Sequence, residues 1–481
     1  MSDSLMVGVS GVRGVVGVDL TPELVARWAA AFGVFLGKGE AGRGKGPRRT
    51  HSAVVLGRDS RTSGPMLAAA ATAGLVSVGC DVIDAGLVAT PTVQLAVEHH
   101  RAAGGLVLTA SHNPIEWNAL KFVGPDGVFL GAEAVSRVRD LAGDGRLPRA
   151  GHAGLGQVAP DGRAVERHIT AVLRLSAVTA RRVRARRLTV ALDTVRGAGG
   201  VVMPALLARL GCRVRGINLE TDGRFPRAPE PTPERLGDLG ALVRRAGADV
   251  GFAVDPDVDR LAIVDERGRA IGEDYTLACA VRAVLGKREA GSGKRRPARP
   301  PDAPTSRRPV VVCNLSTSLV VDDAARACGA MVDRAPVGEA HVARRIIELG
   351  AAIGGEGNGG VMYPALHVGR DAPLAAALVL ALLAREGRTV SELVAAAPRY
   401  VIVKAQAPRG ASLDGAYASL RARFPDAAPD ARDGLRLAWT DRWLHVRPSN
   451  TEPIVRLIAE APTRAEAEAL VEEGRARCAA S

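Results

Sequence analysis

Residues 108–122 (LTASHNPIEWNALKF) change abruptly from apolar to polar. The preceding run, GGLVL, is typical of a buried strand, so Ser111 and His112 follow where that strand would end. Adjacent side chains in an extended chain point in opposite directions, so this pair alone does not indicate a catalytic dyad. A helix cap or a side-chain turn accounts for the motif equally well. A chemical role for Ser111 therefore requires a partner elsewhere in the chain.

Three aspartates at alternate positions supply a candidate partner. Asp255, Asp257 and Asp259 lie in VDPDVDR, directly after another apolar run. Gathering three carboxylates is unfavourable unless a cation neutralises them, and ligands made only of oxygen select a hard ion such as Mg²⁺. An EF-hand calcium loop is excluded, because Arg260 stands where that loop requires glycine. The pattern favours a Mg²⁺ site over the alternative, an acidic turn facing solvent.

Two further loops have the composition of ligand sites. Residues 354–360 (GGEGNGG) embed Glu356 and Asn358 among glycines, although glycine-rich turns are common and this one alone is weak evidence. Residues 445–453 (HVRPSNTEP) offer a guanidinium fork and neutral donors, which suit a phosphate dianion. Ordinary turn chemistry accounts for this second loop equally well. Its candidate phosphate-binding residues are Arg447, Ser449, Asn450 and Thr451.

The elements that must position these loops follow a repeating pattern. Residues 53–86, 189–218 and 310–335 each show a β-branched run, a polar or small-residue turn, an Ala/Leu-rich helix and a second β-branched run. This order is typical of parallel βαβ units, and open α/β sheets bind ligands at the ends of their strands. The chain beyond residue 397 differs, because three strand-like runs precede one charged amphipathic helix.

We therefore predict an α/β fold of three similar mixed α/β domains, built from βαβ repeats, plus a smaller C-terminal α+β domain. The predicted boundaries are 1–155, 156–267, 268–396 and 397–481. In that order the domains carry the serine motif, the aspartate motif, the glycine-rich loop and the Arg447 loop. A length of 481 residues agrees with several domains.

Composition excludes several functional classes. No apolar run approaches the roughly 20 residues of a membrane span, and no secretion signal is recognisable, so we expect a cytoplasmic protein with no membrane partner. The six cysteines form no C-x-x-C pair, which argues against zinc and disulfides. Much of the net charge of +13 lies in segments 38–49 and 287–308, which contain no aromatic residues to stack on bases. We predict solvated loops there, and no nucleic-acid partner.

Taken together, the motifs resemble those of the α-D-phosphohexomutase superfamily over nearly the whole chain. The motifs in chain order are SGVRG, TASHNP, DPDVDR, GEGNGG and RPSNTEP. The resemblance implies four domains around a central cleft. It also implies an intramolecular phosphotransferase that interconverts hexose 6-phosphates and hexose 1-phosphates. The implied route passes through a phosphoserine enzyme and a 1,6-bisphosphate intermediate.

The resemblance also implies roles for individual residues. Ser111 would carry the phosphoryl group, and a hexose 1,6-bisphosphate would act as primer. One Mg²⁺ would be bound by Asp255, Asp257, Asp259 and an oxygen of phosphorylated Ser111. Positive charge around the transferring group would come from Arg13, Lys121 and Arg260, with Lys121 as a candidate general acid/base and His112 supporting the loop. Ring hydroxyls would contact Glu356 and Asn358, and the distal phosphate would contact Arg447, Ser449, Asn450 and Thr451.

Several positions depart from the family pattern. Asn118 is followed by Ala119 where relatives usually have glycine, and Asn358 replaces a serine. Gly360 stands where relatives often have histidine, and Glu339 occupies a place that some relatives fill with histidine. A proton relay through histidine therefore does not transfer to this chain. His341 and His367 remain as candidates for that task.

The glycine-rich loop and the residues after it (GEGNGGVMYPALHVGRDA) resemble an archaeal-type branch usually assigned as phosphoglucosamine mutase. We expect conversion of glucosamine 6-phosphate to glucosamine 1-phosphate, by a monomer or homodimer whose partner is the small sugar phosphate. Phosphomannomutase/phosphoglucomutase activity is the alternative. A Mg²⁺-dependent sugar phosphatase with Asp255 as nucleophile is a more distant one, because it would leave Ser111 without a task.

Overall fold

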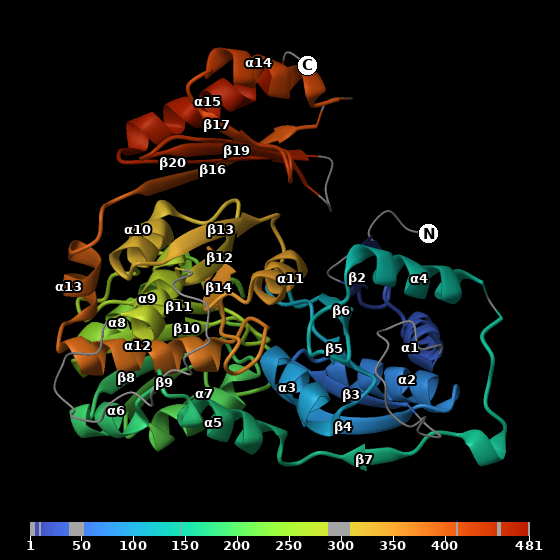
Figure 1. The fold of residues 1–481 in the computed structure, drawn as a ribbon. Helices are drawn as coiled ribbons and strands as arrows, with labels where there is room; N and C mark the ends of the chain where they lie inside the picture. Colours follow the sequence, from blue (N-terminus) through green and yellow to red (C-terminus); the bar gives the residue numbers. More distant parts are fainter. Residues whose placement is uncertain are drawn as a thin grey trace, which may run out of the picture.

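The computed structural model describes residues 5–8, 11–37, 52–144, 146–286, 308–409, 412–449 and 454–479. Four β-sheets, each with its own helices, succeed one another along the chain (Figure 1). The basic segment 38–49 and nearly all of segment 287–308 lie outside the described residues, so the prediction of solvated loops is not tested there.

The first sheet has seven strands in the order β1-β2-β6-β5-β3-β4-β7. Its strands are β1 (Met6–Gly8), β2 (Gly11–Val15), β3 (Ala53–Arg58), β4 (Asp81–Leu87), β5 (Gly104–Leu108), β6 (Trp117–Val123) and β7 (Val158–Pro160). The accompanying helices are α1 (Pro22–Gly37), α2 (Gly64–Val76), α3 (Thr90–His100) and α4 (Ala132–Gly143). Strand β7 pairs with β4, so this sheet continues past residue 155, where the sequence analysis ended the first domain.

The second sheet has the order β11-β10-β8-β9, and a 3-10 turn at His152–Gly154 precedes its helices along the chain. Its strands are β8 (Thr189–Asp193), β9 (Arg213–Ile217), β10 (Val250–Val254) and β11 (Leu261–Val264). Its helices are α5 (Ala164–Arg174), α6 (Ala180–Arg186), α7 (Gly199–Arg209) and α8 (Gly237–Ala246), with a 3-10 turn at Pro233–Arg235.

The third sheet has the order β13-β12-β14-β15. Its strands are β12 (Val310–Asn314), β13 (Met331–Ala335), β14 (Ile353–Glu356) and β15 (Gly360–Met362). Its helices are α9 (Asp274–Leu285), α10 (Leu319–Ala327), α11 (Glu339–Leu349), α12 (Ala372–Glu386) and α13 (Val390–Ala395). Helix α12 is apolar on nearly every side, and it is buried between α9 of this domain and α5, α6 and α7 of the second. The second and third domains therefore share one hydrophobic core.

The three sheets repeat one arrangement, which confirms the predicted α/β class. In each sheet the first and second strands of the repeat pair in parallel, as in β3 with β4, β8 with β9 and β12 with β13. A third strand then lies parallel to the first on its other side, as β5, β10 and β14 do. An antiparallel strand (β6, β11 or β15) follows the third one directly. Each repeat thus has one loop at the carboxyl end of its third strand.

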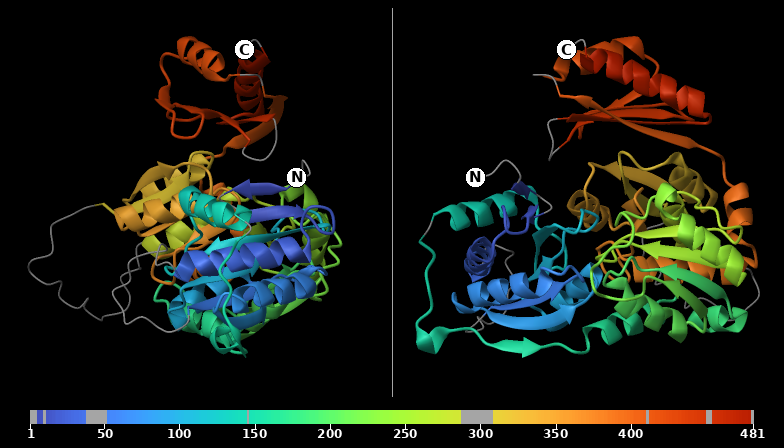
Figure 2. Two further views of the ribbon diagram at one scale, coloured as in Figure 1. Left: turned by 90° about the vertical axis from the view of Figure 1, so that its right-hand side faces the viewer. Right: turned by 180° about the vertical axis from the view of Figure 1, so that it is seen from behind.

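The C-terminal domain is an antiparallel sheet in the order β16-β20-β19-β18-β17. Its strands are β16 (Val401–Pro408), β17 (Ala428–Asp430), β18 (Leu435–Ala438), β19 (Trp443–Pro448) and β20 (Ile454–Ala461), and its helices are α14 (Asp414–Arg423) and α15 (Arg464–Ala479). This is the predicted smaller α+β domain, and it stands at one end of the molecule (Figure 2). Among the described residues, no helix has the length and apolar character needed to cross a bilayer.

Candidate active site

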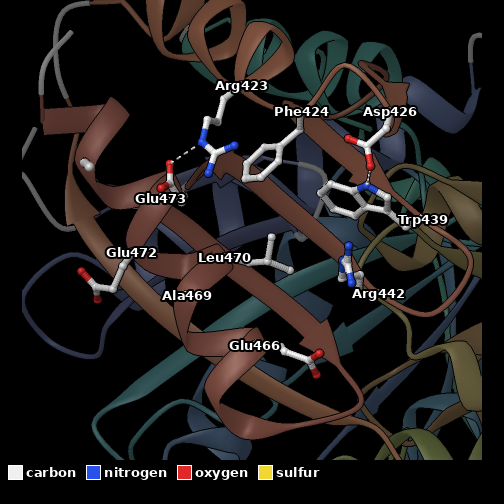
Figure 3. A pocket seen from close by; sticks show the side chains of 11 residues that line it. Arg423, Phe424, Asp426, Trp439, Arg442, Glu466, Ala469, Leu470, Glu472 and Glu473 are labelled. Carbon is white, nitrogen blue, oxygen red and sulfur yellow. Dashed lines mark hydrogen bonds and ion pairs between the residues drawn. The ribbon is translucent and has the colours of Figure 1, made fainter.

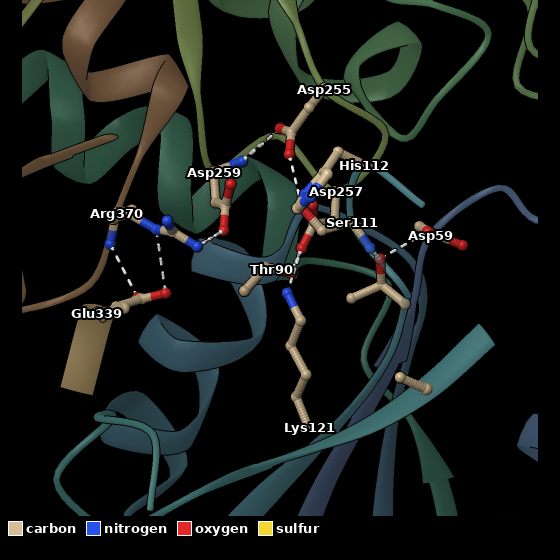
Figure 4. Close-up of polar contacts among 12 residues, drawn as sticks. Asp59, Thr90, Ser111, His112, Lys121, Asp255, Asp257, Asp259, Glu339 and Arg370 are labelled. Atoms are coloured by element: carbon tan, nitrogen blue, oxygen red, sulfur yellow. Dashed lines mark hydrogen bonds and ion pairs between the residues drawn. The ribbon is translucent and has the colours of Figure 1, made fainter. Parts of the chain in front are cut away.

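Ser111 lies in the loop that connects β5 to β6, at the carboxyl end of the third strand of the first repeat. Its Oγ donates a hydrogen bond of 3.0 Å to Oδ2 of Asp255, which follows β10 in the second repeat (Figure 4). Equivalent loops of two domains therefore meet here, and they unite the serine motif with the aspartate motif.

The Ser111 loop is held from behind by residues that the sequence analysis assigned no role. Arg61 is fully buried and pairs with Asp59 at 3.2 Å. Its guanidinium donates to the carbonyl oxygens of Ser111 and Asn113, at 2.7 Å each. Asp59 also accepts a hydrogen bond from the Thr109 hydroxyl, whose oxygen in turn accepts the Ser111 N–H at 2.9 Å. The signal available in the sequence was the polar GRDSR stretch, residues 57–61, at the carboxyl end of β3.

The three aspartates form a compact, buried carboxylate cluster. Each offers an oxygen that lies within 4.8 Å of those of the other two. Asp257 Oδ2 accepts a hydrogen bond from Lys121, and Asp259 Oδ2 accepts one from Arg370. The other oxygen of each of these two aspartates is buried and accepts no hydrogen bond from the described residues. Asp259 Oδ1 lies 3.6 Å from Arg260 Nε, too far for a hydrogen bond. Because buried oxygens without a hydrogen bond are costly, these residues fit a divalent cation bound among them and Asp255.

Burial and neighbouring charges shift the pKa values of Asp255 and Asp257 in opposite directions. Burial, together with the charges of Asp259 and Asp257, raises the pKa of Asp255 well above its usual value. Burial would also raise the pKa of Asp257, but Lys121 at 2.8 Å and the Thr90 hydroxyl lower it below the ordinary value. A bound cation would relieve the repulsion that this unequal ionisation reflects.

His112 is held in its neutral form. The charge of Arg260, burial and the charge of Arg13 lower the pKa of His112 to about 2. Its Nδ1 lies 3.5 Å from Ser111 Oγ, at the limit of a hydrogen bond. Arg13 also donates to the side chain of Asn113, so it both charges and braces the Ser111 loop.

A cavity of about 350 Å³ opens above Ser111 and gathers residues from all four domains. It contains most of the predicted site residues, and the aspartate cluster lies beside it. The predicted residues that line it are Arg13, Ser111, His112, Lys121, Arg260, Glu356, Asn358, Arg447 and Ser449. Asn450 and Thr451 lie outside the described residues. His341 also lines the cavity, whereas His367 is buried against Asp371 and is not among the lining residues.

The wall contributed by the third domain is built around Glu356. Its Oε1 accepts hydrogen bonds from the Asn314 side chain at 2.9 Å and the Gly338 N–H at 3.1 Å. Its Oε2 accepts one from Arg370 at 2.8 Å. Burial would raise the pKa of Glu356, but Arg370 and Asn314 lower it below the usual value. Glu356 is therefore ionised and fixed in place beside the cavity.

Arg447 enters the cavity from β19 of the C-terminal domain. Its Nε donates to Asp433 at 3.0 Å, and the same carboxylate oxygen accepts the N–H of Val337 at 3.0 Å. Asp433 therefore links the predicted phosphate-binding loop to a residue of the third domain that also lines the cavity.

A larger hollow of about 830 Å³ lies elsewhere, on the outer side of the C-terminal domain (Figure 3). Phe424 and Trp439 meet edge to face there at 5.3 Å, and the Arg442 guanidinium lies 5.2 Å from the Trp439 ring. None of the predicted site residues lines this hollow. Size therefore does not identify the site, whereas the convergence of charged residues does.

Comparisons with known proteins agree with this geometry. Models of the phosphoglucomutase/phosphomannomutase family match in sequence: α/β/α domain I at residues 4–146, domain II at 166–268, domain III at 274–400 and the C-terminal domain at 403–476. A phosphoglucomutase/phosphomannomutase of Thermococcus kodakarensis is 37% identical over 97% of both chains. A probable phosphoglucosamine mutase of Methanopyrus kandleri is 37% identical over 97% of this chain and 96% of its own. A crystal structure of a phosphoglucomutase/phosphomannomutase family protein from Burkholderia thailandensis superposes with a TM-score of 0.82 at 26% identity, covering 100% of this chain and 98% of that one.

Proposed function

The chain belongs to the phosphoglucomutase/phosphomannomutase family and is an intramolecular phosphotransferase, and from this premise we propose that it converts glucosamine 6-phosphate to glucosamine 1-phosphate. The observation that carries the proposal is the cavity in which Ser111, Glu356 and Arg447 meet, with Ser111 Oγ bonded to Asp255. Phosphoryl transfer between the two ends of a sugar requires a group that carries the phosphoryl, a site that neutralises its charge and a site that holds the other phosphate. Ser111, the aspartate cluster and the Arg447 loop can fill these three roles.

In the proposed reaction Ser111 carries the phosphoryl group, supplied at first by a hexose 1,6-bisphosphate primer. The free hydroxyl of the hexose 6-phosphate attacks phosphorus, the bond from phosphorus to Ser111 Oγ breaks, and a 1,6-bisphosphate forms. The bisphosphate then reverses its orientation in the cavity. Ser111 Oγ attacks the phosphorus of its 6-phosphate, which restores phosphoserine and releases the hexose 1-phosphate. In each half the attacking hydroxyl loses one proton and the leaving oxygen gains one. We assign this proton transfer to Lys121, which lines the cavity.

Asp255, Asp257 and Asp259 would hold one Mg²⁺ beside Ser111. The support is chemical: three buried carboxylates lie within reach of one another, and two of their oxygens accept no hydrogen bond from the described residues. When bound, Mg²⁺ offsets the charge that develops on the transferring phosphoryl group. Arg13 and Arg260 add positive charge around the same position.

The remaining residues of the cavity bind the substrate in our proposal. Arg447 and Ser449 hold the phosphate that is not being transferred, and Asn450 and Thr451 are assigned to the same loop from the sequence. A guanidinium provides paired donors for phosphate oxygens. Asn358 and Glu356 face the sugar ring from the third domain.

Preference for an amino sugar is supported by the charge of that wall. Glu339 and Glu356 both line the cavity, and they share a single guanidinium, that of Arg370. Glu356 is ionised, so an ammonium group at C2 of glucosamine would be attracted by its carboxylate, whereas a hydroxyl at C2 would gain less. Phosphomannomutase/phosphoglucomutase activity is the alternative, because one similar protein carries that name.

The test compares kcat/KM for the 6-phosphates of glucosamine, glucose and mannose, with bisphosphate primer and Mg²⁺ present. We expect glucosamine 6-phosphate to give the highest value. A higher kcat/KM for glucose or mannose 6-phosphate would contradict the proposed substrate and support phosphomannomutase/phosphoglucomutase activity instead. Removal of Mg²⁺ with EDTA should abolish turnover, and its return should restore it.

Ser111→Ala tests the phosphocarrier. We expect this variant to lose isomerisation and the incorporation of phosphate from labelled primer, because no oxygen remains to accept the group. Ser136→Ala is the control, since the Ser136 hydroxyl lies on α4 away from the cavity and accepts a hydrogen bond from the exposed Arg139. Release of inorganic phosphate that survives in Ser111→Ala would instead support a phosphatase with Asp255 as nucleophile.

A further inference from the structure

Arg370 lies between the aspartate cluster and the sugar-facing wall, in the segment that follows the glycine-rich loop. Its guanidinium contacts three carboxylates that come from separate parts of the chain, and Figure 4 shows two of them, Asp259 and Glu339. It donates to Asp259, it pairs with Glu356 at 2.8 Å, and its Nε lies 3.1 Å from Glu339. The Arg370 N–H also donates to Glu339 at 3.2 Å. The side chain is 9% exposed, so solvent screens these contacts little.

Gly360 leaves the space that the Arg370 side chain occupies. A Cβ on Gly360 would lie 2.3 Å from Arg370 Cδ and 2.8 Å from Cγ, far inside van der Waals contact. The backbone of Gly360 is not in the left-handed region, so its conformation would accept any residue. Glycine is therefore required here by its neighbour and not by its own φ. Arg370 has little freedom to retreat, because its far end is fixed by three carboxylates.

Two departures from the family pattern thus meet at one side chain. Gly360 stands where the family pattern often has histidine, and Glu339 occupies a place that some relatives fill with histidine. Here the first supplies the space for Arg370 and the second supplies a charge that pairs with it. Gly360 without Arg370 would leave an empty space, and Glu339 without Arg370 would be a buried glutamate lacking this cationic partner. Both situations are unfavourable, so each residue is explained only together with Arg370.

We propose that Arg370 is a positioning residue, which fixes Glu356 on the third-domain wall of the cavity relative to Asp259 in the aspartate cluster. Gly360 gives the Arg370 side chain its space, and Glu339 pairs with its charge, so the three residues act as one unit. This inference rests on the proposed function for the meaning of those two sites. Arg370 also lines the cavity, and in this proposal it acts through Glu356 and Asp259, the two carboxylates that it bridges. Displacing it should therefore weaken binding of the sugar phosphate and of the cation together.

Gly360→Ala tests the unit without removing any charged group. We expect the added methyl to displace Arg370 and to raise both the KM for the sugar phosphate and the Mg²⁺ concentration for half-saturation. Loss of a supporting contact behind a metal ligand changes affinity by about 10- to 100-fold. Mg²⁺ binding is measured by thermal shift as well as by activity, so this readout does not depend on the sugar substrate. Gly131→Ala is the control, because no atom lies within 4 Å of the position of its added Cβ.

A double-variant cycle separates this unit from a general defect. In an Arg370→Ala background Cγ and Cδ, the atoms that a methyl at position 360 would strike, are absent, so adding Gly360→Ala should cost much less than in the wild type. Arg370→Lys retains the charge but cannot bridge three carboxylates, and it should recover only part of the loss. Equal costs of Gly360→Ala in both backgrounds, or unchanged Mg²⁺ half-saturation in Gly360→Ala, would overturn the proposal. Absence of mutase activity in the wild type would refute the proposed function alone, since the cation measurements would still test the unit.

Discussion

Ser111 has a left-handed backbone conformation with φ of +48°, and Val258 in the aspartate turn has φ of +63°. This region costs a residue with a side chain about 1–2 kcal/mol, so each loop needs contacts that hold it there. Arg61 binds the carbonyl of Ser111, and Asp255 Oδ1 accepts the N–H groups of Asp259 and Arg260, which closes the turn. Both reacting loops are therefore shaped before any substrate arrives, which is the preorganisation that phosphoryl transfer requires.

Asp274 gives a pH dependence of stability. Burial raises the pKa of Asp274 to about 7, although its carboxylate accepts the Ser318 N–H at 2.8 Å. An unfolded chain releases this proton near pH 4, so the folded state alone holds it between about pH 4 and 7. Stability from this group is therefore greatest below pH 4 and falls as pH rises through 7. Asp274→Asn does not titrate, so between about pH 4 and 8 its stability should gain about 4 kcal/mol on that of the wild type, because the pKa of Asp274 differs by about three between the folded and unfolded chains.

Urea unfolding of Asp274→Asn and wild type at pH 5, 6, 7 and 8 measures this difference, which should grow with pH. Asp238→Asn provides the control, because Asp238 is an exposed aspartate in the first turn of α8. A gain of Asp274→Asn that stays constant across this range would contradict a titration of Asp274.

The repeated strand order explains why the site loops and their supports lie at one edge of each sheet. The loop after the third strand carries the reacting or binding residue, and the loop after the first strand supports it from behind. Arg61 after β3 holds the Ser111 loop, and Asn314 at the end of β12 holds Glu356. In the second repeat the N–H of Ala198, past the end of β8, donates to the carbonyl of Pro256 in the aspartate turn at 2.9 Å.

This division also shows what the sequence could and could not predict. The strand–helix–strand repeats were predictable because β-branched runs and Ala/Leu-rich helices have distinct periods, and the C-terminal strands β16, β18 and β19 were recognisable for the same reason. Ser111 and the aspartate turn stood out as polar residues at the ends of apolar runs. Arg61 and Arg370 did not, because their importance comes from partners more than 40 residues or a whole domain away. Nothing in the local sequence HVGRDA indicates that Gly360 leaves room for an arginine.

Helix α3 offers a stability change that leaves the site intact. It ends at Arg101, an exposed residue in the left-handed conformation with φ of 49°. Glycine adopts this conformation without the steric cost that a side chain imposes, so Arg101→Gly should stabilise the protein by about 0.5–1 kcal/mol. Asp144→Gly is the matched control, because α4 ends there with φ of −67°, where glycine brings no gain. A shift of the urea midpoint measures both, and equal effects of the two variants would contradict the argument.

In the proposed reaction, the C-terminal domain must stay over the cavity while the bisphosphate reverses its orientation there. The contacts that fix this domain lie on the third domain, at the start of α10 and near Val337 (Figure 2). Ser316 also bonds His445 of β19 at 2.8 Å. Arg447, to which we assign phosphate binding, is thus placed partly by residues that do not line the cavity, namely Ser316, Leu319 and His445. In our proposal, substrate affinity therefore depends on residues that do not touch the substrate.

Glu460 of β20 is fully buried, and its carboxylate accepts hydrogen bonds at both oxygens. One oxygen accepts from the Ser318 hydroxyl, and the other accepts from the Leu319 N–H at 2.8 Å and from Trp443 Nε1 at 2.6 Å. A negative charge at the start of α10 is also favoured by the helix dipole. In Glu460→Gln one oxygen becomes an N–H₂ group that faces donors, so the contact should weaken by about 2 kcal/mol.

We expect Glu460→Gln to loosen the C-terminal domain, and hence to raise the KM for the sugar phosphate with a smaller change in kcat. Small-angle X-ray scattering should show a larger radius of gyration, and hydrogen exchange should quicken at the Leu319 amide. Glu468→Gln on α15 is the control, because Glu468 is 54% exposed and its pair with Arg464 is 3.6 Å long. If Glu460→Gln kept the wild-type scattering curve and KM, the position of Arg447 would have to depend on the Asp433 link instead, and Asp433→Asn would then show the loss.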